Sequence, residues 1–147
     1  GWLPTANAIQ WRASLDKRLN WQQPVVQVYG RQHPVPRMTV FLAAKGLHYR
    51  YSGTRHTGVG WPAWFTPLLD RVNKACGSNF NGCLLNLYRD GEDRMGWHAD
   101  DESLFRGRER DCPIVSLSLG ATRECALGPS KIALFNSTLG TCAPEML

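Results

Sequence analysis

The hydrophobic pattern changes period at Gly77, and this change limits the possible folds more than any other feature of the sequence. Before Gly77, five apolar residues recur at helical spacing (Phe65, Leu68, Leu69, Val72 and Cys76). Pro62 near the start and Gly77 at the end favour a helix between them. After Gly77 the period becomes two, which is typical of strands. Helices followed by strands predict an α+β fold with a β-sandwich or barrel core.

The remaining elements follow from the same patterns. Apolar residues at 8, 11, 15 and 19 predict an amphipathic N-terminal helix. Strands are expected at 25–29, 38–42 and 47–51, and after Gly77 at 83–88, 94–98, 113–119, 124–127 and 131–135. No repeat, low-complexity tract or linker interrupts the chain, so we expect one domain over residues 1–147. Its parts would be residues 1–75, with the helices, and residues 76–147, with the core strands.

Composition excludes several classes of protein. The 147 residues contain no apolar run near the ~18–20 residues of a membrane span, and no signal peptide opens the chain. The five cysteines are dispersed and form no CxxC pair, so neither a disulfide framework nor a zinc knuckle is indicated. We therefore expect no membrane association, no secretion and a reducing compartment, which is the nucleus in a eukaryote and otherwise the cytoplasm.

The charge is divided unevenly along the chain. Residues 1–74 contain ten Lys/Arg and two Asp/Glu, whereas residues 75–147 contain seven and ten, which together give the net charge of +5. A basic half beside an acidic half suggests a surface for a polyanion next to a site for a cation such as a metal ion.

The side chains with the clearest chemistry lie between residues 86 and 100. In a strand, residues two apart share a face, so Asn86 and Tyr88 would point together, as would His98 and Asp100. A hairpin at 90–91 would bring the two pairs into one polar pocket. An imidazole and a carboxylate two residues apart can bind one metal ion, as part of the 2-His-1-carboxylate triad of non-haem iron enzymes. By itself, however, HxD is a common tripeptide that usually faces water.

Four segments together carry a more specific signal: VQVYGRQHPVPR, LHYRYSG, NLYRDGEDRMGWHADDE and PIVSLSLGATR. From about residue 25 to residue 127 they resemble the AlkB family of Fe(II)/2-oxoglutarate-dependent dioxygenases, and in particular its duplex-DNA repair branch. The resemblance implies a double-stranded β-helix, or jelly roll, preceded by N-terminal helices and a nucleotide-recognition lid.

The resemblance also implies roles for individual residues. His98 and Asp100 would be iron ligands, and Asn86 and Tyr88 would hydrogen-bond 2-oxoglutarate. The implied reaction is oxidative demethylation of an N-alkylated DNA base, with Fe(II), 2-oxoglutarate and O2, and with release of formaldehyde.

A second group of residues is implied on the nucleic-acid side. Tyr29 matches a finger that enters the base stack when a nucleotide is flipped out. Tyr49, Tyr51 and Ser52 match the lid hairpin that encloses the flipped base, and Glu102 matches an acidic residue that suits a base made cationic by methylation. Four arginines could contact phosphates (Arg31, Arg37, Arg50 and Arg55). The implied partner is duplex DNA, bound by a monomer.

The C-terminal part departs from the family pattern. No histidine follows His98, and no arginine follows Arg123, whereas the family uses a later histidine for iron and late arginines for 2-oxoglutarate. We therefore expect incomplete C-terminal strands, and an inactive chain is included among the hypotheses. Two alternatives stay open: a catalytically dead nucleic-acid binding module, and a magnesium-dependent nuclease with an acidic cluster (Asp90, Glu92, Asp93, Asp100, Asp101 and Glu102).

Overall fold

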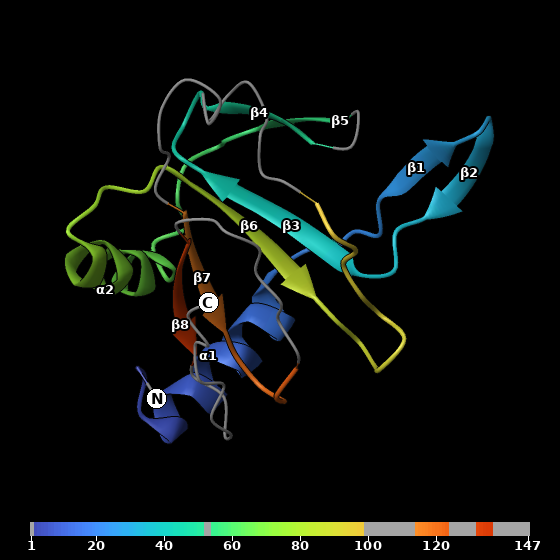
Figure 1. Ribbon diagram of the computed structural model, residues 1–147. Coiled ribbons are helices and arrows are strands. Elements are labelled where there is room, and N and C mark those ends of the chain that lie inside the picture. Colours follow the sequence, from blue (N-terminus) through green and yellow to red (C-terminus); the bar gives the residue numbers. More distant parts are fainter. Residues whose placement is uncertain (1, 52–53, 99–113, 124–131, 137–147) are drawn as a thin grey trace. The chain divides into compact units, whose positions relative to one another are not determined.

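A computed structural model describes residues 2–51, 54–98, 114–123 and 132–136 (Figure 1). The chain divides into two compact units, one of residues 20–98 and one that joins residues 1–19 with residues 99–147. Each unit is described by itself below. The expected single domain with a division near residue 75 stays a prediction.

The centre of the 20–98 unit is an antiparallel pair of strands, β3 (Met38–Ala43) and β6 (Gly82–Leu87) (Figure 1). Directly opposed residues include Thr39 with Asn86 and Val40 with Leu85. Leu42 and Ala43 are buried at the end of β3. The strands predicted at 38–42 and 83–88 are therefore confirmed, because alternating β-branched and apolar residues suit a half-buried strand.

Two hairpins accompany this pair: one precedes β3 in the sequence, and the other lies between β3 and β6. The first joins β1 (Val25–Val28) to β2 (Arg31–Pro34), and the second joins β4 (His48–Tyr51) to β5 (Thr54–Thr57). Sequence patterns predicted β1 and β4 but neither return strand, because 31–34 and 54–57 are polar and lack apolar alternation. The return strands form through pairing with β1 and β4.

The helix α2 (Thr66–Cys76) confirms the predicted element of this region. It starts at Thr66, after a turn in which the Pro62 carbonyl accepts the backbone N–H groups of Phe65 and Thr66. Gly77 ends the helix in the left-handed conformation with φ 58°, as expected for a residue without a Cβ. Phe65, just before the helix, and Leu68 within it are buried, and the Phe65 ring stacks on Trp61.

The other unit contains α1 (Thr5–Arg18) and the parallel pair of β7 (Ile114–Ser118) and β8 (Ile132–Asn136). Ala8 and Leu15, two residues of the predicted apolar stripe, are buried. The helix and both strands confirm the sequence predictions, whereas the strand expected at 124–127 lies outside the described residues. Among those that are described, no helix has the length and apolar character needed to cross a membrane.

The strand predicted at 94–98 and the two-residue hairpin at 90–91 are wrong, because residues 88–98 form no strand. Hydrogen bonds to a side chain form a turn here instead. The Asp90 carboxylate accepts hydrogen bonds from the backbone N–H groups of Glu92 and Asp93, at 2.9 and 3.2 Å. Such local bonds compete with a strand ladder. The helix α2 and the antiparallel strand pairs of the 20–98 unit agree with the α+β class, although each described sheet contains two strands.

Candidate active site

The first part of the site lies on the β3–β6 sheet. Asn86 is opposite Thr39, and the Arg37 guanidinium reaches it from the residue before β3, with Arg37 Nε 3.0 Å from Asn86 Oδ1. Arg37 is 4% exposed. Because Oδ1 accepts this bond, the amide of Asn86 presents its Nδ2 hydrogens to other acceptors, such as a carboxylate. Tyr88, the second residue expected to bind 2-oxoglutarate, is half-buried just after β6.

A tight turn connects this sheet to the HxD motif. Asp93, which is 3% exposed, accepts three hydrogen bonds from Arg89: from the backbone N–H at 2.9 Å, and from Nε and Nη2 at 2.8 Å each. The carboxylate raises the pKa of the Arg89 guanidinium further, chiefly through this hydrogen bonding. The backbone N–H of Arg94 then bonds to the Pro36 carbonyl, which ties the end of the turn to the residues before β3.

The second part of the site is His98, whose side chain is exposed. Its Nδ1 is 2.9 Å from the Gly96 carbonyl oxygen. Since a carbonyl oxygen only accepts hydrogen bonds, Nδ1 carries the proton, and the lone pair of a neutral ring is on Nε2. Metal-binding histidines are held in this way, with one ring nitrogen donating and the other directed to the metal. His98 therefore fits the expected iron ligand.

The other expected ligands and base contacts are not all visible. Four of these residues lie outside the described residues: Ser52, and the three members Asp100, Asp101 and Glu102 of the acidic cluster. In the ranges that the structure covers, no three His, Cys, Asp or Glu side chains come together as a metal site. Asp90 and Asp93 instead close the turn described above, which disfavours the magnesium-nuclease hypothesis.

The expected DNA finger is the tip of the β1–β2 hairpin. Tyr29 is fully exposed, and Tyr29 and Gly30 both have positive φ, 47° and 77°. Positive φ at both central residues is the geometry of a two-residue type I′ turn. Tyrosine rarely adopts it, so the backbone is held in an unfavourable conformation that displays the ring to solvent.

The remaining expected DNA contacts differ in their placement. Tyr49 is only 6% exposed, and its ring stacks on Phe41 with centroids 5.2 Å apart. Tyr51 ends β4. Of the four arginines, Arg37 lies inside the fold, whereas Arg31, Arg50 and Arg55 are exposed. A phosphate contact by Arg37 and a base contact by Tyr49 stay predictions.

Sequence reasoning missed the contact between Arg37 and Asn86, and it assigned no role to Phe41 or Thr39. The alternation in β3 could have indicated that Thr39 and Phe41 lie on one face of the strand, because they are two residues apart. Thr39 is opposite Asn86, so this is also the face of Asn86. The pairing of β3 with β6 could not be read from that alternation.

Comparison with known proteins identifies the family of the chain. A family profile described as the 2OG-Fe(II) oxygenase superfamily matches residues 1–138. The proteins named DNA oxidative demethylase ALKBH2 are 39% identical over 122 residues in Arabidopsis thaliana and 38% identical over 99 residues in Homo sapiens. These matches cover 80% and 67% of this chain. The human alpha-ketoglutarate-dependent dioxygenase alkB homolog 3 is 41% identical over 90 residues, or 60% of this chain and 29% of that protein.

The chain belongs to the 2OG-Fe(II) oxygenase superfamily, whose domains are of jelly-roll type, and within it to the AlkB family. The matches cover 38% and 37% of the Arabidopsis and human ALKBH2 proteins, so the chain spans less than two fifths of the length of these relatives.

Proposed function

We propose that this chain is part of a Fe(II)/2-oxoglutarate-dependent oxygenase that removes methyl groups from N-alkylated DNA bases by oxidation. The observation that carries the proposal is the hydrogen bond from His98 Nδ1 to the Gly96 carbonyl, which places the lone pair on Nε2, the tautomer that a metal ion needs. Two relatives named DNA oxidative demethylase support DNA as the substrate.

The residues of this chain would divide the work as follows. His98 Nε2 and the Asp100 carboxylate would hold iron, and Asn86 Nδ2 and the Tyr88 hydroxyl would donate hydrogen bonds to 2-oxoglutarate. When bound, iron and 2-oxoglutarate supply the O2-dependent oxidation that hydroxylates the N-methyl group, which then leaves as formaldehyde. Arg37 would fix the orientation of the Asn86 amide, and the Arg89–Asp93 turn would hold the segment between Tyr88 and His98.

The two hairpins would form the nucleotide-recognition lid. Tyr29 would enter the duplex and fill the space of the flipped base, which offsets part of the few kcal/mol that unstacking costs. Its full exposure supports this role. Tyr49, Tyr51 and Ser52 would lie on the lid side of the base, and Glu102 would face its positive charge.

Further parts of the proposal concern the whole protein. We propose that it acts as a monomer, in the nucleus of a eukaryotic cell or in the cytoplasm of a prokaryotic one. Residues 99–147 contain no histidine, and no arginine follows Arg123. The second histidine ligand and the late arginines that the family resemblance implies therefore have no counterpart in these residues.

The deciding experiment is an anaerobic Fe(II) titration in the presence of 2-oxoglutarate, followed by the iron-to-cosubstrate charge-transfer band. We expect a saturable band that is lost in His98→Ala and retained in His48→Ala. His48 is a matched control, since this exposed histidine bonds to Thr57 Oγ1 at 3.1 Å on the β4–β5 hairpin. Demethylation of a methylated duplex would then be measured by formaldehyde release.

Other outcomes would favour the alternatives. Absence of the band, together with salt-dependent DNA binding that His98→Ala leaves unchanged, would indicate a catalytically dead binding module. Strand cleavage that needs Mg²⁺ and no iron would indicate a nuclease and contradict the proposal.

A further inference from the structure

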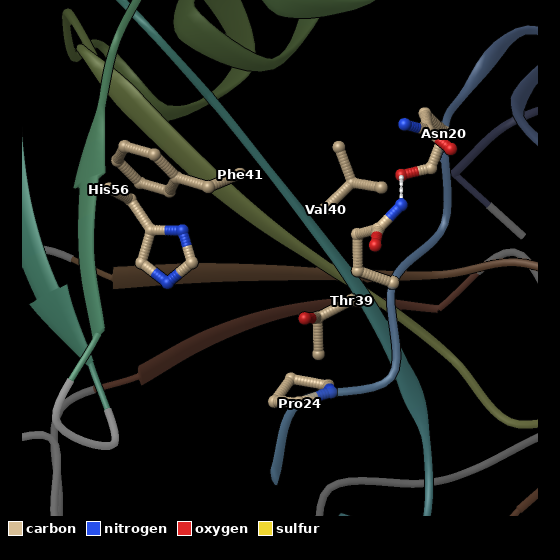
Figure 2. A pocket seen from close by; sticks show the side chains of 7 residues that line it. Asn20, Pro24, Thr39, Val40, Phe41 and His56 are labelled. Atoms are coloured by element: carbon tan, nitrogen blue, oxygen red, sulfur yellow. Dashed lines mark hydrogen bonds between the residues drawn. The ribbon is translucent and has the colours of Figure 1, made fainter.

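The β4–β5 hairpin has two faces with different chemistry. Directly opposed residues of an antiparallel pair share a face, so Tyr49 and His56 lie together on one face. Tyr49 stacks on Phe41 of β3 with ring centroids 5.2 Å apart, and the His56 ring lies 5.7 Å from the same phenyl ring. Figure 2 shows His56 beside Phe41, where both residues line a cavity of about 280 Å³. This inner face is therefore directed to β3.

The outer face of the hairpin is exposed and cationic. It is formed by two directly opposed pairs, His48 with Thr57 and Arg50 with Arg55, and all four residues are exposed. His48 Nδ1 and Thr57 Oγ1 are 3.1 Å apart, so this pair is joined by a hydrogen bond. The other pair contributes two positive charges, and none of the four residues is acidic. The outer face therefore has an electrostatic preference for an anion.

Two arginines at directly opposed positions lower the stability of a hairpin. Opposed Cβ atoms of an antiparallel pair are about 4.5–5.5 Å apart, and like charges at this spacing repel each other. An anion that contacts both guanidinium groups would offset this repulsion. The register that places Arg50 opposite Arg55 therefore indicates one anion-binding site that both residues share.

The chemistry of arginine restricts the kind of anion. Each guanidinium is planar and presents a fork of N–H donors, which matches the oxygen atoms of a phosphate group. The oxygens of one phosphate accept several hydrogen bonds, so a single phosphate can contact both forks. A nucleic-acid strand presents such groups in a row, with one negative charge for each nucleotide. An exposed, cationic hairpin face is complementary in charge to this backbone.

We propose that the outer face of the β4–β5 hairpin binds the DNA backbone, with one phosphate held between Arg50 and Arg55. The choice of DNA among phosphate compounds rests on the proposed function. Tyr49, which the proposed function assigns to the flipped base, is on the opposite face. The phosphate therefore belongs to a nucleotide other than the flipped one, and the hairpin would contact two separate parts of the substrate.

The test is the binding of an unmodified labelled duplex, measured by fluorescence anisotropy at several salt concentrations without iron or 2-oxoglutarate. Arg50→Gln and Arg55→Gln should each weaken binding about fivefold and lower the slope of log Kd against log salt by about 1. The double variant should lower the slope no further, because both arginines contact the same phosphate. Arg50→Lys keeps the charge but loses the fork, so it should keep the slope and recover only part of the affinity.

Thermal unfolding of the free protein gives an independent readout. Each Gln variant loses the repulsion between the two guanidinium groups, so it should unfold at a higher temperature than the wild type while it binds DNA more weakly. A lower unfolding temperature in both variants would show that a carboxylate of the chain itself pairs with the arginines, and it would overturn the proposal.

Lys74→Gln is the matched control, because it removes one positive charge from an exposed position on α2. It should leave the affinity and the salt slope as in the wild type. An equal loss in this control, or an unchanged slope in both arginine variants, would also overturn the inference. The iron titration described above keeps the two proposals separate. Altered salt slopes in a chain without the charge-transfer band would support the outer-face site and contradict the oxygenase, and the reverse result would do the opposite.

Discussion

Arg37 and Asn86, 49 residues apart in the sequence, are joined by a hydrogen bond of 3.0 Å between Nε and Oδ1. The guanidinium is almost completely buried, and Asn86 is the residue expected to bind 2-oxoglutarate. The bond uses the acceptor of the amide and thereby determines which way its donor faces. We therefore propose that Arg37 is a positioning residue for cosubstrate binding.

Arg37→Ala should weaken 2-oxoglutarate binding by about 10-fold, since the loss of an orienting partner commonly costs ~10–100-fold. It should also lower the free energy of unfolding by about 1.5–3 kcal/mol, because a part-buried hydrogen bond from a charged group is lost. The first effect is measured by titration of the charge-transfer band and the second by urea denaturation. Arg31→Ala, on the exposed β2 strand, is the control. An unchanged cosubstrate affinity in Arg37→Ala would contradict the positioning role.

Asn86→Asp distinguishes the orientation of the side chain by Arg37 from the donation of a hydrogen bond by its amide N–H to 2-oxoglutarate. The carboxylate still accepts the Arg37 hydrogen bond, but it has no N–H to donate and repels the negative cosubstrate. We expect little loss of stability with a loss of 2-oxoglutarate affinity at least as large as that of Arg37→Ala. Equal affinity in Asn86→Asp and wild type would show that the Asn86 amide does not bind 2-oxoglutarate.

Two ion pairs at the same i,i+4 spacing should differ in their contribution to stability. Asp93, with a side chain 5% exposed, accepts three bonds from Arg89, whereas Arg12 and Asp16 on α1 are joined at 3.0 Å with side chains 40% and 41% exposed. Asp93→Asn should lower the free energy of unfolding by about 1–3 kcal/mol. Asp16→Asn should cost about 0.3–0.5 kcal/mol. Urea denaturation of both variants gives the comparison, and equal effects would contradict it.

Tyr29 should act through its ring, which suits insertion into a base stack. Tyr29→Ala should weaken binding to a methylated duplex more than binding to the same single strand, whereas Tyr29→Phe should bind both normally. Fluorescence anisotropy with labelled oligonucleotides measures the affinity of each variant for the duplex and for the single strand. The wild-type chain with the same two oligonucleotides is the control. Equal losses on duplex and single strand in Tyr29→Ala would remove the assignment of the finger.

Cys83 should make stability depend on alkaline pH. Burial of its thiol raises the pKa from 9.0 to about 12, although part of the residue's surface is exposed. Between these pH values the unfolded chain loses the thiol proton and the native chain keeps it, so the free energy of unfolding falls as pH rises. The slope is at most about 1.4 kcal/mol per pH unit.

Urea denaturation at pH 8, 9, 10 and 11 tests this dependence against Cys83→Ala. The variant lacks the thiol, and its stability should fall less steeply above pH 9, while all other ionising groups are common to both proteins. Identical slopes would show that the thiol ionises equally in the native and unfolded chains.

The sequence alone determined the elements that local periodicity encodes. Both helices, the paired strands β3 and β6, and the glycine that ends α2 follow from spacing and backbone preference within a few residues. Four segments between about residues 25 and 127 also identified the family, because together, in this order and spacing, they are specific.

Tertiary structure decided what depends on distant residues. Arg37 meets Asn86 only because β3 pairs with β6, and the burial of Tyr49 follows from its stacking on Phe41 across two sheets. The expected hairpin at 90–91 failed for a related reason, since Asp90 and Asp93 bond backbone and side-chain groups within the turn and replace the strand ladder. Periodicity reports which face a residue occupies, whereas hydrogen bonds and contacts across strands determine which groups that face meets.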